Sequence, residues 1–428
     1  MVVRTHKPDY ILLTAVGVLV IFGLVMIYSA SFVEAVTRIS DQTSTGLGNQ
    51  FYYVLRQMVG ALIGTVGMLV LQRIDYTVWR RFSVGLMFGC LVLLGLVLVL
   101  PAGWTEVNGS RSWIRFGEGG VFGLFSIQPS EIVKLVMVIY FADWLSGRSE
   151  KVGNVTYGLV PFAMVLGLVC SLVLFQPDLG TTVVLVLIGG AIYFAAGARL
   201  WHVIGAILVS ALVFWLVVVV AGFRSARIMA FLDPEKYYST SGFQPTHALY
   251  ALGSGGIFGQ GLGLSRQKFQ WLPQAHTDAI FAIIGEELGF IGTTAVLVAF
   301  AVIAYRGYRI AGRAPDPFAA LVAVGITSWI TFQALINLGV TTSLLPFTGL
   351  TLPFLSYGST SLYTCMFGIG ILLNISKHTS QQRIEEISDG PRTRSPSPFA
   401  FFNAAALRRG NGRTRLSSPG SSRGYRRR

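Results

Sequence analysis

The stretch YILLTAVGVLVIFGLVMIYSASF, residues 10–32, decides the class of fold. No charged side chain interrupts it, and about 20 apolar residues are enough for a helix to cross roughly 30 Å of hydrocarbon. A basic start precedes it, as in a secretory signal peptide, but the apolar part of a signal peptide is only about 7–15 residues long. We therefore interpret this run as an uncleaved first membrane span.

Similar apolar runs recur along the 428-residue chain, of which 53% is hydrophobic and only 12% charged. Soluble domains carry roughly twice that share of charge, and the short alternating segments of a membrane β-barrel are not visible. The sequence predicts an all-α polytopic membrane protein of about ten transmembrane helices. They are expected near residues 10–32, 53–71, 82–100, 126–145, 155–175, 180–197, 202–222, 278–305, 318–341 and 350–375.

The distribution of Lys and Arg predicts the orientation, because cytoplasmic loops carry an excess of them. An even number of spans places both termini on one side, and that side collects the larger share of basic residues. Residues 377–428 alone hold 12 Lys/Arg against 3 Asp/Glu. We expect a membrane domain over 1–378 with both termini cytoplasmic. Residues 379–428 should form a disordered basic tail that lies against anionic lipid heads rather than nucleic acid.

A long loop over about 223–277, predicted to lie outside the membrane, is unusually basic for that side. It contains GSGGIFGQGLG, residues 253–263, which looks like a phosphate-binding fingerprint. No strand precedes this segment, and no G-x-x-x-x-G-K-[ST] motif occurs in the chain, so a nucleotide site is not expected. We expect a flexible segment at the outer surface, in part re-entrant.

Asp278 opens the eighth predicted span directly after this basic loop. One interpretation is a helix cap, since a helix N-terminus stabilises a carboxylate. The other is a catalytic base beside cations that could hold a phosphate. Glu286 and Glu287 follow about 12 Å further along the helix. We expect Glu286 nearer a polar cavity and Glu287 paired with another helix.

Other ionisable groups in or near the spans are functional candidates, because charge inside a membrane is costly. Glu131 and Lys134 lie three residues apart on one helix face, either as a structural ion pair or lining a polar cavity. Asp178 is interpreted first as a turn cap, and His276, two residues before Asp278, as a local hydrogen-bond partner rather than a metal ligand. The histidines are too dispersed for a metal centre. The three cysteines, Cys90, Cys170 and Cys365, are interpreted as small core residues.

A series of motifs along residues 8–378 resembles the FtsW/RodA/SpoVE (SEDS) family of bacterial cell-wall proteins, its division and sporulation members more than RodA. They occur in the family's order on ten predicted spans. The motifs are PDYILLTAVGVLVIFGLVMIYSAS, QRIDYTVWRR, VNGSRSWIRFG, FSIQPSEIVKL, QPDLGTT, RIMAFLDPEKY, ALGSGGIFGQGLGLSRQKFQWLPQAHTDAIFAIIGEELGFIG and LPFTGLTLPFLSYGSTSL.

The resemblance implies a peptidoglycan glycosyltransferase that polymerises lipid II on the outer face of the bacterial cytoplasmic membrane, at the division septum. It implies a class B penicillin-binding protein and other division proteins as partners, and Asp278, in the H-T-D motif, as the base. Positive charge, or a divalent cation such as Mg²⁺ or Mn²⁺, would stabilise the pyrophosphate leaving group. The side chains expected to bind substrate are Arg111, Trp113, Arg115, Lys134, Arg224, Arg227 and Lys268. Those expected to support the cavity are Glu131, Asp178, His276 and Glu286.

The chain departs from the family pattern at Ala279, where Phe is usual, and in SYGSTS, where SYGGSS is common. Neither departure removes a charge, so both bear on packing near Asp278 rather than on its role. Two alternatives remain open at this stage. A lipid II flippase would depend on the charges inside the membrane, whereas a scaffold for the penicillin-binding protein would not need Asp278.

Overall fold

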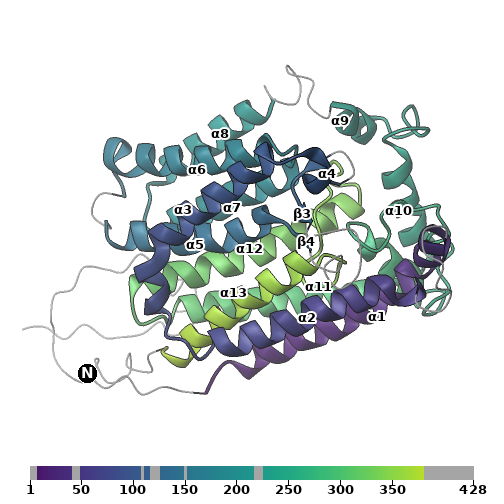
Figure 1. The fold of residues 1–428 in the computed structure, drawn as a ribbon, viewed down its shortest axis with the longest axis horizontal. Helices are drawn as coiled ribbons and strands as arrows, with labels where there is room; N and C mark the ends of the chain where they lie inside the picture. Colours follow the sequence, from purple (N-terminus) through teal and green to yellow (C-terminus); the bar gives the residue numbers. More distant parts are fainter. Residues whose placement is uncertain are drawn as a thin grey trace, which may run out of the picture. The chain divides into compact units, whose positions relative to one another are not determined.

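The chain is mainly helical over the residues that the computed structural model describes, which are 7–40, 49–107, 110–115, 126–148, 152–215 and 225–379. The long helices lie side by side along one direction (Figure 1). A π-helical turn over Val155–Leu159 leads into α6. The helices are α1 (Tyr10–Ser40), α2 (Tyr52–Leu71), α3 (Thr77–Val99), α5 (Pro129–Ser146), α6 (Val160–Leu174), α7 (Leu179–Ala195), α8 (Leu200–Trp215), α11 (Ile280–Ala311), α12 (Pro317–Thr341) and α13 (Ser359–Lys377).

Among the described residues, 7 helical segments are long and apolar enough to cross a membrane, so the predicted count of about ten spans is not confirmed. The helices outside this group are α5, α7 and α8. Glu131, Lys134 and Asp143 reduce the hydropathy of α5, whereas α7 and α8 have only 17 and 16 residues. All three nevertheless correspond to apolar runs that the sequence predicts as spans.

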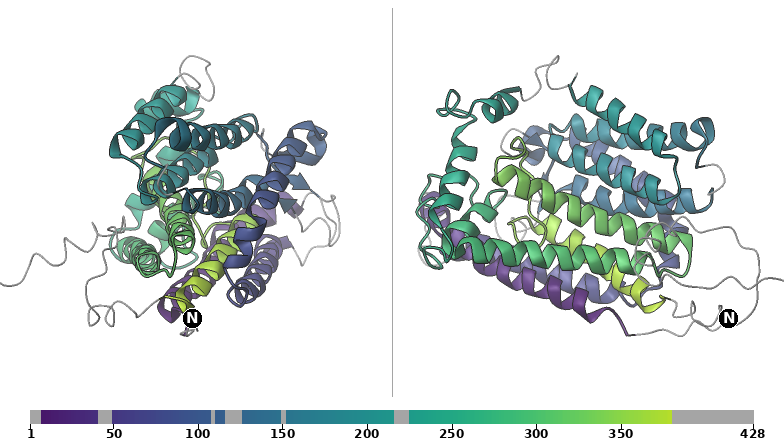
Figure 2. Two further views of the ribbon diagram at one scale, coloured as in Figure 1. Left: turned by 90° about the vertical axis from the view of Figure 1, so that its left-hand side faces the viewer. Right: turned by 180° about the vertical axis from the view of Figure 1, so that it is seen from behind.

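Helix α12 forms the centre of the described bundle, with 20 of its 25 residues buried. It packs against α5, α7, α11 and α13, and Figure 2 (right) shows it alongside α11. Helices α1, α2 and α3, in contrast, expose large apolar side chains such as Ile21, Leu62 and Phe88. Apolar surface of this extent fits a lipid environment, in which hydrocarbon rather than water covers it.

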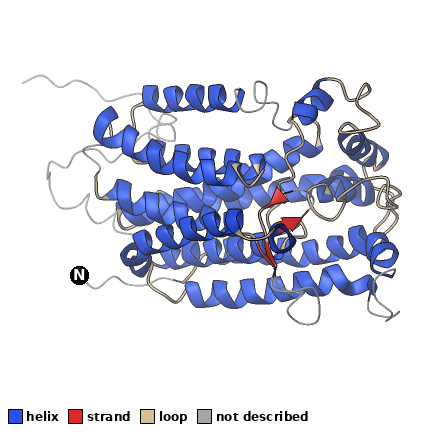
Figure 3. Ribbon diagram, turned by 45° about the horizontal axis from the view of Figure 1, so that its top comes forward, coloured by secondary structure: helices blue, strands red, loops and turns tan. Residues whose placement is uncertain are grey.

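The beginning of α1 and the end of α13 lie at the same end of the bundle, where the Asp9 amide donates to Ser376 Oγ at 3.1 Å. The opposite end carries α4 (Ala102–Thr105), α9 (Ser225–Leu232) and α10 (Phe243–Ser254) (Figure 1). Two small antiparallel sheets also lie there, β1 (Glu106–Val107) with β2 (Ser110–Arg111) and β3 (Ile114–Arg115) with β4 (Ser126–Ile127) (Figure 3). We call this the Asp278 end.

The structure corrects the last predicted span, 350–375, because α13 begins only at Ser359. The preceding residues form a loop in which Gly349 and Phe354 have positive φ values of 75° and 66°, and Pro353 disfavours helix at the residue before it. Leu352 and Leu355 of this loop are nevertheless fully buried. The apolar run therefore reflects a buried loop, which hydropathy does not distinguish from a helix.

The predicted long loop is more structured than expected over its described part, 225–277, where it contains α9 and α10. Helix α10 packs against α11. The prediction of a flexible segment is therefore wrong for this part of the loop. Apart from its first residue, the predicted tail 379–428 lies outside the described residues.

Candidate active site

Asp278 lies just before α11, buried at the Asp278 end of the bundle with 8% of its surface exposed. Its carboxylate Oδ1 accepts hydrogen bonds from Thr277 Oγ1 and Gln244 Nε2, both at 3.3 Å. Asn337 Nδ2 of α12 donates to its main-chain oxygen at 2.8 Å. The N-cap of α11 is Ala279, and it makes no side-chain cap bond. The interpretation of Asp278 as a helix cap is therefore wrong.

Arg227 of α9 is brought close to this carboxylate. A methyl group built on Gly349 would lie 3.8 Å from Asp278 Oδ2 and 4.0 Å from Arg227 Nη1, so the two charged groups flank the same glycine. Arg227 Nη1 also donates to Phe347 O at 3.1 Å. The sequence prediction that a cation of the long loop reaches Asp278 holds for Arg227.

Burial raises the pKa of Asp278 to about 7, against the lowering effects of its hydrogen bonds and of Arg227. A base works best when its pKa lies near the working pH, because it is then deprotonated and still basic enough to take a proton. A pKa of about 7 is therefore compatible with proton abstraction at neutral pH.

A buried polar network lies next to this site. Lys134 Nζ donates to Glu131 Oε1 at 2.8 Å and to Gln333 Oε1 at 2.7 Å, which confirms the predicted pairing of Glu131 with Lys134. Gln333 Nε2 continues to Thr351 O at 3.0 Å, and Asn337 Nδ2 reaches Leu350 O at 2.7 Å. The network thereby holds the loop that carries Gly349 against the Asp278 backbone.

Asp178 has the turn-capping role that the sequence predicts as its simpler interpretation. It is the N-cap of α7, and its Oδ1 accepts from the Thr181 amide at 2.9 Å. Gln128 Nε2 is 3.4 Å from its other oxygen. Asp178 therefore fixes the start of α7 beside the start of α5.

Lys268, predicted to bind substrate, lies instead in a buried ion pair. Its Nζ donates to Glu287 Oε1 at 3.1 Å, to Ser29 Oγ at 3.2 Å and to Gly263 O. An ammonium group has three donors, and these contacts use all of them. The prediction that Lys268 binds pyrophosphate is therefore wrong for this conformation.

Glu286 and Glu287 lie side by side in sequence but bind different groups. The pairing expected for Glu287 is found. Glu286 is buried, and Ser265 Oγ and the Arg266 amide, the latter at 2.8 Å, donate to its carboxylate; these contacts do not test the expectation that it lies nearer a polar cavity. Glu287 does pair with another helix, since Ser29 Oγ of α1 donates to it at 2.6 Å. Both glutamates tie the long loop to the bundle.

The contacts of His276 are made with α1 and with the loop before α13. Its Nδ1 lies 3.2 Å from Glu34 Oε2 of α1, and its ring packs against Tyr53 and Tyr357, with centroid distances of 4.5 Å and 5.4 Å. The Tyr357 amide donates to the His276 main-chain oxygen at 2.9 Å. His276 therefore joins the end of the long loop to α1 and to the loop before α13.

The remaining predicted substrate-binding residues are not tested by these contacts. Arg111 is exposed on β2, and Arg115 and Trp113 are half-buried on and beside β3. Arg224 lies outside the described residues. Within the described ranges, no group of three His, Cys, Asp or Glu side chains could hold a metal ion. The divalent cation remains a prediction.

Sequence reasoning missed Gln244, Asn337 and Gly349. Amides and glycines carry no charge signal, and these three come from α10, α12 and the loop before α13. The H-T-D and S-Y-G motifs contain none of the three residues, so the motifs do not indicate that these residues are neighbours of Asp278. Only the fold brings them together around Asp278.

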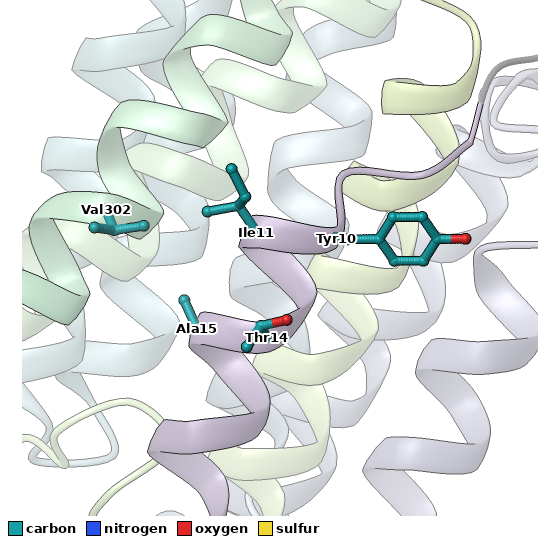
Figure 4. A pocket seen from close by; sticks show the side chains of 5 residues that line it. All are labelled: Tyr10, Ile11, Thr14, Ala15 and Val302. Carbon is teal, nitrogen blue, oxygen red and sulfur yellow. The ribbon is translucent and has the colours of Figure 1, made fainter.

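A surface cavity of about 390 Å³ lies at the end of the bundle opposite to Asp278. Figure 4 shows its lining side chains, four from the start of α1 and Val302 from the last third of α11, among them Tyr10 and Ile11. A smaller cavity, about 20 Å³, lies beside Arg227 between α9 and the loop after α12. A volume of that size holds about one water molecule, so this cavity beside Arg227 is too small for a sugar.

The fold and the site together define a polytopic helical membrane protein with a buried carboxyl group near one end of its bundle. The chain belongs to the FtsW/RodA/SpoVE family, described as cell cycle proteins, which it matches over residues 10–381. It is 44% identical to the stage V sporulation protein E of Bacillus subtilis over 89% of this chain and all of that protein. It is 41% identical to a probable peptidoglycan glycosyltransferase FtsW of Trichlorobacter lovleyi, over 87% of this chain and 94% of that one.

Solved structures agree with this assignment. A structure of a peptidoglycan synthase complex, reported for its coordination of polymerization and crosslinking, is matched with a TM-score of 0.69 at 25% identity, over 87% of this chain and 99% of that one. The rod shape determining protein RodA of Thermus thermophilus is matched with a TM-score of 0.61 at 26% identity, over 87% of this chain and 98% of that one.

Proposed function

We propose that this protein is a peptidoglycan glycosyltransferase that polymerises lipid II, with Asp278 as the general base. The observation that carries the proposal is the buried carboxyl group of Asp278, whose pKa is raised to about 7. The Arg227 guanidinium group lies close to it, on the other side of Gly349. The relatives named as probable glycosyltransferases support the reaction class.

The proposed step is a displacement at the anomeric carbon of the donor sugar. Asp278 takes the proton of the acceptor 4-hydroxyl, whose oxygen forms the new glycosidic bond with inversion. The bond from the anomeric carbon to the pyrophosphate breaks, and undecaprenyl diphosphate leaves with the electron pair. Arg227 lies where a cation can stabilise the charge that develops on that pyrophosphate.

Partners and location complete the proposal. The similarity to a chain of a peptidoglycan synthase complex supports a class B penicillin-binding protein as partner, with other division proteins at the septum. We place the Asp278 end at the outer face of the bacterial cytoplasmic membrane, with both termini in the cytoplasm. The basic residues near the other end, such as Arg73, Arg80 and Arg313, favour this orientation.

The test is polymerisation of lipid II by the purified full-length protein, alone and with its penicillin-binding partner, with glycan chains detected on a gel. Wild type should make polymer, whereas Asp278→Asn, shown to be folded by gel filtration and thermal unfolding, should make none. Lys236→Gln, an exposed change in the same loop, is the matched control and should polymerise normally.

Two outcomes would count against the proposal. If wild type makes no polymer even with its partner, lipid II translocation in vesicles should be measured, and loss of transport in Lys134→Ala would favour a flippase. If Asp278→Asn supports growth and polymerisation normally, the protein is a scaffold or uses another base.

A further inference from the structure

The glycine-rich segment 253–263, which the proposed reaction does not use, packs against a break in α11. The break is at Gly289, with φ 66° and ψ −161° inside an otherwise continuous helix. Such a break frees the carbonyl groups of Glu286 and Glu287 and the amides of Phe290 and Ile291 from their partners within the helix. Inside a membrane, unpaired backbone groups of this kind are expensive.

The segment satisfies all four of these groups. The amides of Gln260 and Gly261 donate to Glu286 O and Glu287 O at 2.9 Å and 3.0 Å. In return, Gly256 O and Ile257 O accept from the amides of Phe290 and Ile291 at 2.9 Å and 3.2 Å. Four hydrogen bonds to the loop thus replace the two that α11 loses between residues 286–287 and 290–291.

This pairing requires glycine. A methyl group on Gly255 would collide with Gly285 O, and one on Gly259 would collide with Glu287 O. Two glycines of the segment that resembles a phosphate-binding motif, Gly255 and Gly259, are therefore required because two backbones touch, and Gly256, Gly261 and Gly263 have positive φ values.

Two polar contacts between α1 and α11 indicate how deep this segment lies. Arg306 Nε donates to Asp9 Oδ2 at 2.7 Å, and Ser29 Oγ donates to Glu287. The two contacts are separated by about 30 Å of helix at 1.5 Å per residue, the thickness of a bilayer's hydrocarbon core. If the Asp9–Arg306 pair lies at one edge of the hydrocarbon, residues 256–261, which pair with 286–291, lie at the other edge, nearest the Asp278 end.

The exposed side chains of the segment are apolar. Ile257, Phe258, Leu262 and Leu264 are each more than half exposed, and residues 248–265 contain no Asp, Glu, Lys or Arg. Ile257 pairs through its backbone with Ile291, itself exposed on a span of mean hydropathy 2.1. The apolar surface of the loop therefore continues that of the membrane-spanning helix.

We propose that residues 254–265 form a re-entrant hairpin whose exposed apolar side chains insert among the phospholipid acyl chains of the leaflet at the Asp278 end. The hairpin follows α10, which carries Gln244, and precedes Ser265 and Arg266, which bind Glu286. It holds the two segments of the loop on either side of it, α10 and the residues that lead to Asp278, at a fixed depth in the membrane.

The test measures the contact with lipid directly. In the full-length protein with Cys90, Cys170 and Cys365 replaced by alanine, a nitroxide is attached at Phe258→Cys in phosphatidylethanolamine and phosphatidylglycerol nanodiscs. Its collisions with O₂, which enters lipid, and with a water-soluble nickel chelate are compared. Val298→Cys, exposed on α11, is the lipid control, and Ser239→Cys, exposed between α9 and α10, is the aqueous control.

The expected result is an O₂-to-nickel collision ratio at position 258 several times that at 239 and approaching that at 298. A ratio equal to that at 239 would overturn the proposed insertion into lipid, because the side chain at position 258 would then face water. Low collision rates with both reagents would also overturn it, since protein rather than lipid would cover the surface. Leu262→Cys repeats the measurement if Phe258→Cys does not fold.

Discussion

Burial both activates Asp278 and makes its charge costly to hold. The carboxylate retains only two side-chain hydrogen bonds at 3.3 Å and the nearby Arg227, so loss of water outweighs them and raises its pKa to about 7. An exposed aspartate of pKa 3.8 would be ionised but a much weaker base. Burial therefore makes Asp278 harder to ionise and, once ionised, a stronger base.

The pH dependence of polymerisation follows from that pKa. Below about pH 7 the active, deprotonated form should fall tenfold per pH unit, so kcat/KM should rise with pH and level off above neutrality. Arg227→Gln removes a charge that lowers the pKa, so the rise should move to higher pH. Lys236→Gln is the control. If kcat/KM of Arg227→Gln rises at the same pH as that of wild type, however low the activity, Arg227 does not lower the pKa of Asp278.

The same pKa predicts how stability changes with pH. Below pH 3.8 the carboxyl group is protonated in both folded and unfolded chains; between 3.8 and about 7 only the unfolded chain releases its proton. The unfolded chain then binds fewer protons, so stability falls as pH rises. Three pKa units correspond to about 4 kcal/mol. Asp278→Asn should therefore melt a few degrees above wild type at pH 8, with the gap closing toward pH 4; an unchanging gap would argue against this account.

For single residues, the sequence predicted which charged side chains lie at the site better than it predicted which groups they contact. A charged residue in an apolar stretch is conspicuous, so Asp278 and the Glu131–Lys134 pair were identified, and Arg227 was identified as one of several cations in the basic loop. The partner that a charge selects depends on the fold, which is why the prediction for Lys268 was wrong. Its position in a basic loop suggested phosphate, but the fold brings Glu287 to it.

At the scale of elements, the break in α11 depends on one residue. Gly289 adopts a conformation that is accessible essentially only to glycine, and a methyl group there would collide with Gly259 N. Gly289→Ala should lower the free energy of unfolding by about 2–4 kcal/mol, measured as thermal unfolding in detergent. Gly253→Ala on α10, where a methyl group meets nothing within 4 Å, should be nearly neutral. Equal melting temperatures for the two variants would disprove the constraint.

The ion pair between the long loop and α11 makes a second prediction at this scale. Lys268→Met leaves Glu287 buried and unpaired, which should cost about 3–5 kcal/mol. Adding Glu287→Gln removes that charge and should restore most of the stability, as thermal unfolding would measure. The double variant should also polymerise lipid II. A folded but inactive double variant would show instead that Lys268 binds substrate.

Hydropathy predicted where helices occur better than where they end. The runs that became α2 and α12 matched within one residue, because lipid-facing and core-facing helices are both apolar. The same signal failed at 350–358, where the apolar side chains are buried in a loop. It also could not reveal α10, whose sequence FQPTHALYALGS is short and only moderately apolar.

At the scale of the whole molecule, the hydrogen bond between Asp9 and Ser376 places the first and last helices at one end of the described bundle. An even number of crossings satisfies this contact, whereas 7 crossings would separate the ends. Helix α5 is too polar to count as a span by composition, but 13 of its 18 residues are buried. A helix surrounded by other helices need not be apolar enough for lipid, so we expect α5 to cross as well. Helices α7 and α8 are short rather than polar, and we expect them to cross because neither contains Asp, Glu, Lys or Arg. Together with the 7 long apolar helices these three give ten crossings, an even number.

This topology can be measured with single cysteines in the background that lacks the native three. Ser239→Cys, between α9 and α10, should react with a membrane-impermeant maleimide on intact cells. Arg313→Cys, between α11 and α12, should react only after permeabilisation, because ten crossings with cytoplasmic termini place that turn inside. A reporter active only outside the membrane, fused after Lys377, should be inactive, since α13 ends at the same end as α1 begins. Labelling of Arg313→Cys on intact cells would reverse the orientation and place Asp278 on the face opposite to the one where its substrate is proposed to be polymerised.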